Sequence, residues 1–159
     1  MVDPSFEITL SNNRTEKEAL NYLLGADSRF YLPNSEQKRE ILESFGLDSK
    51  KYIRSFDLIR MISPLEIGVK MSSDDLASSE LIELKSTKKY LPENPRGFFF
   101  GATENEFNCA KEIVSAGGNY KFCFVSLHED SRSFSLLSVD EVNSLIHSKR
   151  VQFQINLKK

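Results

Sequence analysis

The sequence predicts a mixed α/β or α+β domain whose central sheet is flanked by helices. Helical segments come first along the chain, then a run of strand-like segments, then further helices and strands. The chain has 159 residues, of which 40% are hydrophobic, so it can bury one sizeable core. We expect residues 55–159 to form the core domain, with residues 1–54 as an N-terminal helical segment that either stands apart or belongs to the same domain.

Helix starts are marked by capping boxes, in which a Ser or Thr caps the first turn and a Glu three residues later reaches back. The boxes are Thr15–Glu18, Thr103–Glu106 and Ser138–Glu141. Ser35 is expected to cap a further helix. The predicted helices cover residues 15–24, 35–45, 103–116 and 138–146, and glycines follow the first three as stops.

Strands are predicted where apolar residues alternate or run together between turn residues. The predicted strands are 6–10, 55–62, 65–69, 80–87, 97–101, 120–127, 133–137 and 151–157. Residues 71–79 are rich in Ser and Asp and predict a turn, whereas residues 27–34, 47–54 and 88–96 predict loops or connectors.

Composition excludes several classes of protein. The formal net charge is −2, so any nucleic-acid binding must use a local basic patch. Cys109 and Cys123 are not spaced as metal ligands, and we expect both to be reduced, as in an intracellular, cytoplasmic protein. No apolar run reaches the roughly 18 residues of a membrane helix, and residues 1–4 lack secretory character, so we expect no membrane partner.

Beyond Glu80 at its start, the strand predicted at residues 80–87 carries two charged residues next to its apolar ones. Glu83 and Lys85 lie two residues apart and therefore share one face of the strand. An unpaired buried charge is expensive, so the two side chains must bind each other, water at the end of the sheet, or a ligand. Asp57 is a third charged residue in an apolar strand, the one predicted at residues 55–62.

Carboxylates on adjacent strands are ligands that Mg²⁺ accepts, together with water and substrate phosphate. If Asp57 and Glu83 meet, Lys85 is placed to hold or deprotonate a water, or to stabilise charge on a phosphate. The spacing is common in itself, because acid-x-Lys also occurs at residues 36–38 and 48–50, although neither lies in an apolar strand. The alternative is a plain ion pair at a strand end, with Asp57 far from Glu83.

Asp57 in one strand, followed by Glu83-Leu84-Lys85 in another, resembles the PD-(D/E)XK, or restriction-endonuclease-like, nuclease superfamily. More specifically, the chain is similar to the C-terminal nuclease-like domain of plant NO VEIN proteins and its bacterial relatives in restriction and defence systems. Those domains carry an acid in a strand, a strand ending Glu-Val-Lys-(Thr/Ser/Gly)-Thr, an apolar strand, a Thr-x-x-Glu helix start and a Tyr-containing strand. The segments that carry this likeness are residues 82–87, 98–100, 103–110 and 120–125.

The resemblance implies a restriction-endonuclease-like mixed sheet and a nuclease that hydrolyses DNA phosphodiester bonds with Mg²⁺, for which Mn²⁺ can substitute. It implies that Asp57 and Glu83 are the metal carboxylates and that Lys85 is the catalytic lysine. Glu18 is the best match to an acid that the family tends to carry in an N-terminal helix. Glu106 is a further accessory acid, which either reaches the metal or a water, or satisfies the backbone at Thr103 as part of its capping box.

Nucleic-acid contacts are expected beside this site. The candidates are Ser86, Thr87, Lys88, Lys89 and Arg96, which either contact backbone phosphates or form an ordinary solvated surface. The partner would be DNA, bound by a homodimer or within a larger restriction or defence complex. The alternative from another class is a non-catalytic DNA-docking or protein-interaction module of a larger complex that uses the same fold.

Overall fold

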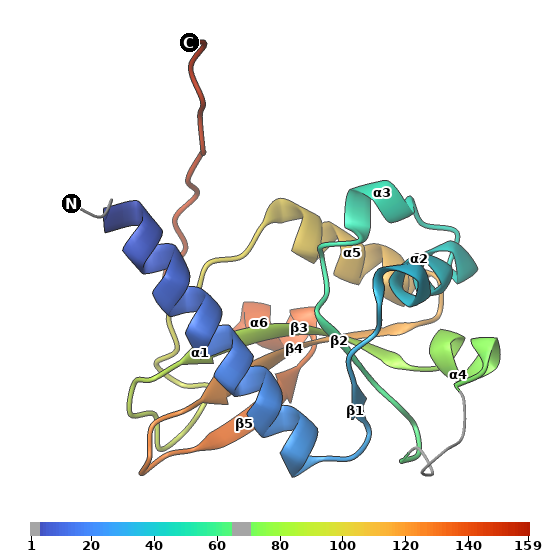
Figure 1. The fold of residues 1–159 in the computed structure, drawn as a ribbon, viewed down its shortest axis with the longest axis horizontal. Coiled ribbons are helices and arrows are strands. Elements are labelled where there is room, and N and C mark those ends of the chain that lie inside the picture. Colours follow the sequence, from blue (N-terminus) through green and yellow to red (C-terminus); the bar gives the residue numbers. More distant parts are fainter. Residues whose placement is uncertain (1–3, 65–70) are drawn as a thin grey trace.

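Five strands form one mixed sheet in the order β1-β2-β3-β4-β5 (Figure 1). The structure, a computed structural model, describes residues 4–64 and 71–159, with side chains from Arg14 onward. The strands are β1 (Phe30–Tyr31), β2 (Leu58–Arg60), β3 (Glu80–Thr87), β4 (Asn119–Ser126) and β5 (Ser133–Leu137). β3 and β4 run parallel, whereas the other neighbouring pairs are antiparallel. The predicted α/β class, with a central sheet and an N-terminal helix, is confirmed.

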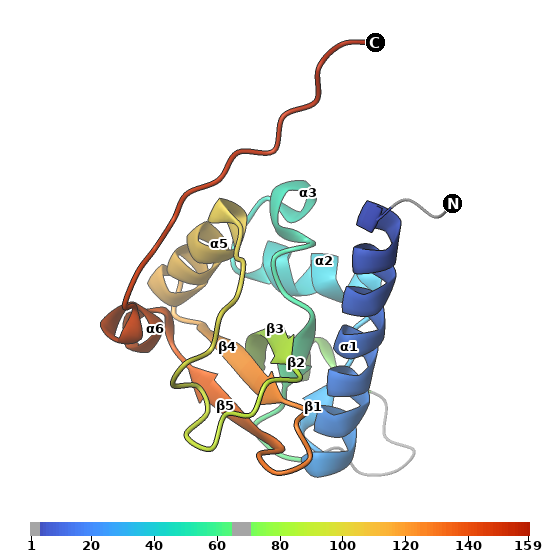
Figure 2. The ribbon, with the colours of Figure 1, turned by 90° about the vertical axis from the view of Figure 1, so that its left-hand side faces the viewer.

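Helices cover both faces of the sheet. They are α1 (Pro4–Ala26), α2 (Ser35–Ser44), α3 (Ser49–Tyr52), α4 (Ser73–Ala77), α5 (Glu104–Ser115) and α6 (Val139–Leu145). Figure 2 shows α1 on one side of the sheet and α5 and α6 on the other. Among the described helices, none combines the length and the apolar character needed to cross a bilayer.

Each face of the sheet carries its own apolar cluster, because side chains alternate along a strand. Leu81 of β3 belongs to the cluster under α2, α5 and α6, whereas Ile82 and Leu84 belong to the cluster under α1. Glu83 and Lys85 alternate with Ile82 and Leu84, so they lie on the α5 side of β3. Both clusters include residues from before position 54, so the N-terminal helices are built into the same core as the strands.

Capping boxes start α5 and α6 at Thr103 and Ser138, as predicted. The prediction that Ser35 caps α2 is wrong, because Asn34 does so. The physical reason is the residue that lies three positions after each candidate cap. Asn34 forms its box with Gln37, whose side chain can accept a hydrogen bond, whereas the residue three after Ser35 is Lys38, which has no acceptor.

The N-terminal prediction is wrong in two respects. Residues 6–10 belong to α1 rather than to a strand, and the box at Thr15–Glu18 lies inside this helix. No Gly or Pro separates Pro4 from Thr15, so nothing in the chain stops a helix that begins at Pro4. The short helices α3 and α4 replace the connector and the turn predicted at residues 47–54 and 71–79.

Two further strand predictions are also wrong. Residues 97–101 form no strand, although Phe98 and Phe100 each pack against Phe124 with ring centroids 5.0 Å apart. Their segment has no edge to join there, because β4 already pairs with β3 and β5. Residues 151–157 form an exposed tail that leaves the body of the molecule after α6 (Figure 2). The strand predicted at residues 65–69 lies outside the described residues.

Candidate active site

The candidate site lies where β2 and β3 separate. The described pairing of these strands ends with Leu58 opposite Ile82, and Asp57 directly precedes β2. The Asp57 N–H donates to the carbonyl oxygen of Ile82, and the Asp57 Oδ2 accepts from the Leu84 N–H, each over 2.8 Å. A buried N–H without an acceptor is costly, so this second bond holds the Asp57 carboxylate against the edge of β3 beside Glu83.

Glu83, Lys85 and Glu106 form a buried ion-pair network between β3 and α5. The Lys85 Nζ lies 3.2 Å from Glu83 Oε1 and 3.0 Å from Glu106 Oε2. The side chains of Lys85, Glu83 and Glu106 are only 12%, 8% and 9% exposed. The same Glu106 oxygen accepts from the Thr103 N–H over 3.3 Å. Glu106 therefore satisfies the start of α5 and holds the lysine with one carboxylate.

Burial and charge perturb this network strongly. Burial raises the pKa of Glu83 above its usual range, and the neighbouring charge of Asp57 raises it further. Burial alone would lower the pKa of Lys85, but Glu83 and Glu106 outweigh that effect, so the pKa of Lys85 is raised. Lys85 is therefore a fixed ammonium group that can donate hydrogen bonds, rather than a free amine that could take a proton.

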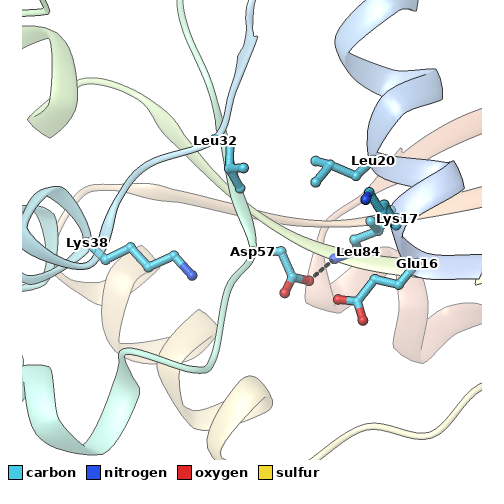
Figure 3. A pocket seen from close by; sticks show the side chains of 7 residues that line it. All are labelled: Glu16, Lys17, Leu20, Leu32, Lys38, Asp57 and Leu84. Carbon is cyan, nitrogen blue, oxygen red and sulfur yellow. Dashed lines mark hydrogen bonds between the residues drawn. The ribbon is translucent and has the colours of Figure 1, made fainter. Parts of the chain in front are cut away.

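Helix α1 brings Glu16, rather than Glu18, to the site. Glu16 and Asp57 line one hollow of about 270 Å³ at the open edge of β3 (Figure 3). Burial raises the pKa of Glu16, and Asp57 raises it further, while Lys85 and Lys38 act in the opposite direction. Glu18 faces away from this hollow, within 3.9 Å of both Lys88 and Arg132. The correction follows from helix geometry.

A residue of α1 that faces the sheet must lie three, four or seven positions from the buried residues of the helix. Glu16 lies three residues before Ala19 and seven before Leu23, both of which are fully buried. Glu18 lies one and five residues before them and falls on another face. The family resemblance that indicates Glu18 implies an acid on this helix but does not fix the face of the helix on which the acid lies.

Lys38 of α2 lies across the same hollow and was not predicted as a site residue. Its side chain extends from α2 toward Asp57, while Glu16 and Lys17 come from α1 (Figure 3). The Lys38 Nζ donates to the carbonyl oxygen of Phe56 over 3.1 Å and lies 5.4 Å from the centre of the Phe56 ring. Helical spacing could have revealed it, because Lys38 lies three residues before the fully buried Ile41.

The predicted nucleic-acid contacts lie at and beyond the C-terminal end of β3. Ser86 and Thr87 end the strand half-buried, and Thr87 Oγ1 accepts from the Lys89 N–H over 3.2 Å. Lys88, Lys89 and Arg96 are exposed in the loop that follows. This loop lies beside α1, since Lys88 pairs with Glu18.

The donor set suits a hard divalent cation. Glu83 Oε2 is buried and has no hydrogen-bond partner among the described residues, and the Asp57 carboxylate is near enough to Glu83 to raise its pKa. Mg²⁺ is commonly held by only one or two carboxylates, with water and substrate phosphate as the other ligands. The described residues contain no group of three or more His, Cys, Asp or Glu side chains close enough to hold a metal ion. A carboxylate pair completed by water and substrate is the arrangement that this geometry allows.

Replacing Glu106 with Ala is expected to lower the free energy of unfolding by about 2–4 kcal/mol, because it removes a helix cap and one partner of a buried lysine. Glu141→Ala is the matched control, since Glu141 holds the same capping position in α6 but is exposed, with Lys121 3.8 Å away. Urea denaturation of both variants measures the difference. Equal losses in the two variants would show that Glu106 contributes only its cap.

Comparisons with family models, with curated proteins and with solved structures find no match to this chain. What the site can do therefore follows from its geometry and its chemistry.

Proposed function

We propose that this chain is a metal-dependent endonuclease domain of the restriction or defence type, which hydrolyses DNA phosphodiester bonds on a restriction-endonuclease-like core. The observation that carries the proposal is the meeting of Asp57, Glu83 and Lys85 where β2 and β3 separate. Glu83 Oε2 is the central feature, because it is a buried carboxylate oxygen that lacks a hydrogen-bond partner among the described residues. Glu80 Oε1 also lacks a hydrogen-bond partner among the described residues, but Arg60 lies 3.8 Å from it, whereas Glu83 has a second carboxylate, Asp57, near enough to raise its pKa. A buried carboxylate in such surroundings is a candidate for a ligand or a chemical role.

The proposed roles follow from charge and position. Asp57 and Glu83 would hold Mg²⁺ or Mn²⁺, and Glu16, which lines the hollow with Asp57, takes the place of Glu18 as the helix carboxylate. The bound ion would supply positive charge to the phosphate and make a water molecule more acidic. Lys85, kept charged by Glu83 and Glu106, donates to the attacking water or to a phosphate oxygen.

In the reaction, the water oxygen forms a bond to phosphorus, and the ester bond to one sugar oxygen breaks. The water gives up one proton to solvent as it attacks, and solvent returns a proton to the departing sugar oxygen. The protein must therefore stabilise negative charge that develops on the phosphate. The fixed ammonium of Lys85 is suited to that task.

The competing hypothesis is a non-catalytic module in which these residues only stabilise the fold. One observation favours it: Lys85 is paired on both sides, and Asp57 satisfies the Leu84 N–H, so each has a structural role. Under this hypothesis Glu83 Oε2 stays without explanation.

Metal-dependent cleavage tests the proposal directly. Purified protein is incubated with supercoiled plasmid and with linear duplex, in Mg²⁺, in Mn²⁺ and in EDTA, and thermal melts are recorded under the same conditions. We expect nicked or linear products with either metal and none in EDTA. We also expect the metals to raise the melting temperature, because a ligand that binds only the folded state stabilises it. Absence of both effects would favour the non-catalytic module.

A further inference from the structure

Lys38 of α2 lines the hollow between α1, α2 and β3. It belongs to no strand of the sheet and forms no ion pair with a described residue. The walls of the hollow are Glu16, Lys17 and Leu20 of α1, Leu32, Lys38 of α2, and Asp57 and Leu84 at the base (Figure 3). Its volume of about 270 Å³ lies below the roughly 300–1,000 Å³ of pockets that enclose a drug-sized ligand. It therefore suits one group of a larger molecule that passes over it.

The Lys38 ammonium is fixed in space relative to Asp57. It donates to the carbonyl oxygen of Phe56, which is fully buried and directly precedes Asp57 in the chain. The Phe56 ring lies 5.4 Å below the ammonium and adds a cation–π attraction. Two anchors on the neighbour of Asp57 hold a side chain that on an exposed surface would sample many rotamers.

No described carboxylate neutralises the positive charge of Lys38 through an ion pair. Among the described residues it forms no ion pair, and the Phe56 carbonyl is its one hydrogen-bond acceptor. An ammonium group has three donors, so two stay available to a ligand. Lys38 nevertheless lies close enough to Glu16 to lower the pKa of that carboxyl. A fixed cation thus faces Glu16 and Asp57, the two carboxylates that line the hollow.

We infer that Lys38 binds a backbone phosphate of the nucleic-acid substrate and positions it over Asp57 and Glu16. This inference rests on the proposed function. A polynucleotide that approaches two carboxylates is repelled, and a cation on the opposite wall offsets that repulsion without reading the base sequence. Lys17, on the α1 side of the hollow, offers a second cation along the same path. The strand would cross the hollow from α2 to α1.

The test measures DNA binding rather than cleavage. Fluorescence anisotropy of a short labelled duplex in Ca²⁺, over a series of salt concentrations, gives Kd and its salt dependence. For Lys38→Met we expect Kd to rise about fivefold to tenfold on every duplex sequence, and the slope of log K against log salt to fall in magnitude by about one. Lys38→Arg keeps the charge and is expected to bind like the wild type.

Lys51→Met is the matched control, because the Lys51 ammonium also lies over an aromatic ring, 5.0 Å from the centre of Tyr52, but does not line the hollow. It is expected to leave Kd and the salt slope unchanged. If Lys38→Met and Lys51→Met have the same Kd and the same salt slope while the wild-type protein cleaves DNA, the inference is overturned. The proposed function then still stands. Equal weakening by Lys38→Met and Lys38→Arg would also overturn the inference, by showing a structural role. Wild-type protein that neither binds nor cleaves DNA would instead refute the proposed function.

Discussion

Replacing Glu83 with Gln is expected to lower metal-dependent DNA cleavage by about a hundredfold to a thousandfold. Gln keeps the size of the side chain but removes the negative charge that a divalent cation needs, so it removes a ligand without creating a cavity. Lys85→Met is expected to cause a loss of similar size, because it removes the ammonium that stabilises charge on the phosphate. Initial rates of plasmid cleavage at saturating Mg²⁺ measure both losses.

Glu80→Gln is the control for this experiment, since Glu80 lies on the same strand and also has a buried carboxylate oxygen without a hydrogen-bond partner among the described residues. Glu80 differs in its surroundings, because Arg60 lies 3.8 Å away and the site residues lie further along β3. We expect wild-type cleavage from Glu80→Gln. Undiminished cleavage by Glu83→Gln or Lys85→Met, with a cooperative thermal melt, would refute the assignment of the site.

The second large effect concerns stability. The melting temperature of Glu83→Gln relative to the wild type is expected to increase steadily as the pH is raised from about 5 to about 9. Burial and the charge of Asp57 raise the pKa of Glu83 in the folded protein. A group of this kind favours the folded state when it is protonated. Its contribution is present below the ordinary glutamate value of about 4.3 and is lost as the pH rises through the folded pKa.

Gln does not titrate, so the Glu83→Gln variant does not lose stability in this way. Its melting temperature relative to the wild type therefore rises with each increase in pH. One unit of pKa is worth about 1.4 kcal/mol, and a chain of this size gains about 2–4 °C for each kcal/mol, so the difference should reach several degrees. Scanning calorimetry across the pH series measures it. A difference that is constant or falls with rising pH would contradict the prediction.

Glu141→Gln provides a control of opposite sign. Hydrogen bonds from Ser138 lower the pKa of Glu141, so its stabilising contribution is present above the ordinary glutamate value and is lost as the pH falls. The difference between this variant and the wild type should therefore change only in the acidic range. Together, the two variants distinguish the cost in stability of ionising the buried Glu83 from the ordinary titration of Glu141 at the start of a helix.

The strands of the site were predictable because their residue pattern fits few secondary structures other than a strand. Residues 80–87, 120–127 and 133–137 each combine strand-forming apolar residues with flanking turn residues, and the observed β3, β4 and β5 agree with them to within one residue. Glu83 and Lys85 were found because charges are rare in such a segment. A period of two also fixes that they share a face.

Contacts between segments that are distant in the sequence decide which of the predicted strands pair in the sheet. Phe98 and Phe100 alternate as in a strand, yet they pack on the sheet instead of joining it, because both edges of β4 are already paired. The tail at residues 151–157 has the same alternation and, in the described structure, no partner at all. Strand periodicity reports which side chains can face one surface, but it does not supply the neighbouring strand.

The helix residues of the site were missed for a different reason. Glu16 and Lys38 are ordinary charged residues in amphipathic helices, and most such residues face solvent. Their importance depends on which way α1 and α2 lie against the sheet, and this follows from the buried positions Ala19 and Ile41. For α1, the family resemblance that indicates Glu18 does not say which face of the helix lies against the sheet.

The exposed tail has a consequence for how the molecule behaves in concentrated solution. Val151, Phe153, Ile155 and Leu157 are 72–86% exposed, and every second residue between them is polar. An extended segment of this kind is a template for intermolecular β-pairing, including pairing with the same segment of another copy. Lys158 and Lys159 repel their counterparts in a neighbouring copy, so raising the ionic strength screens that repulsion and promotes self-association.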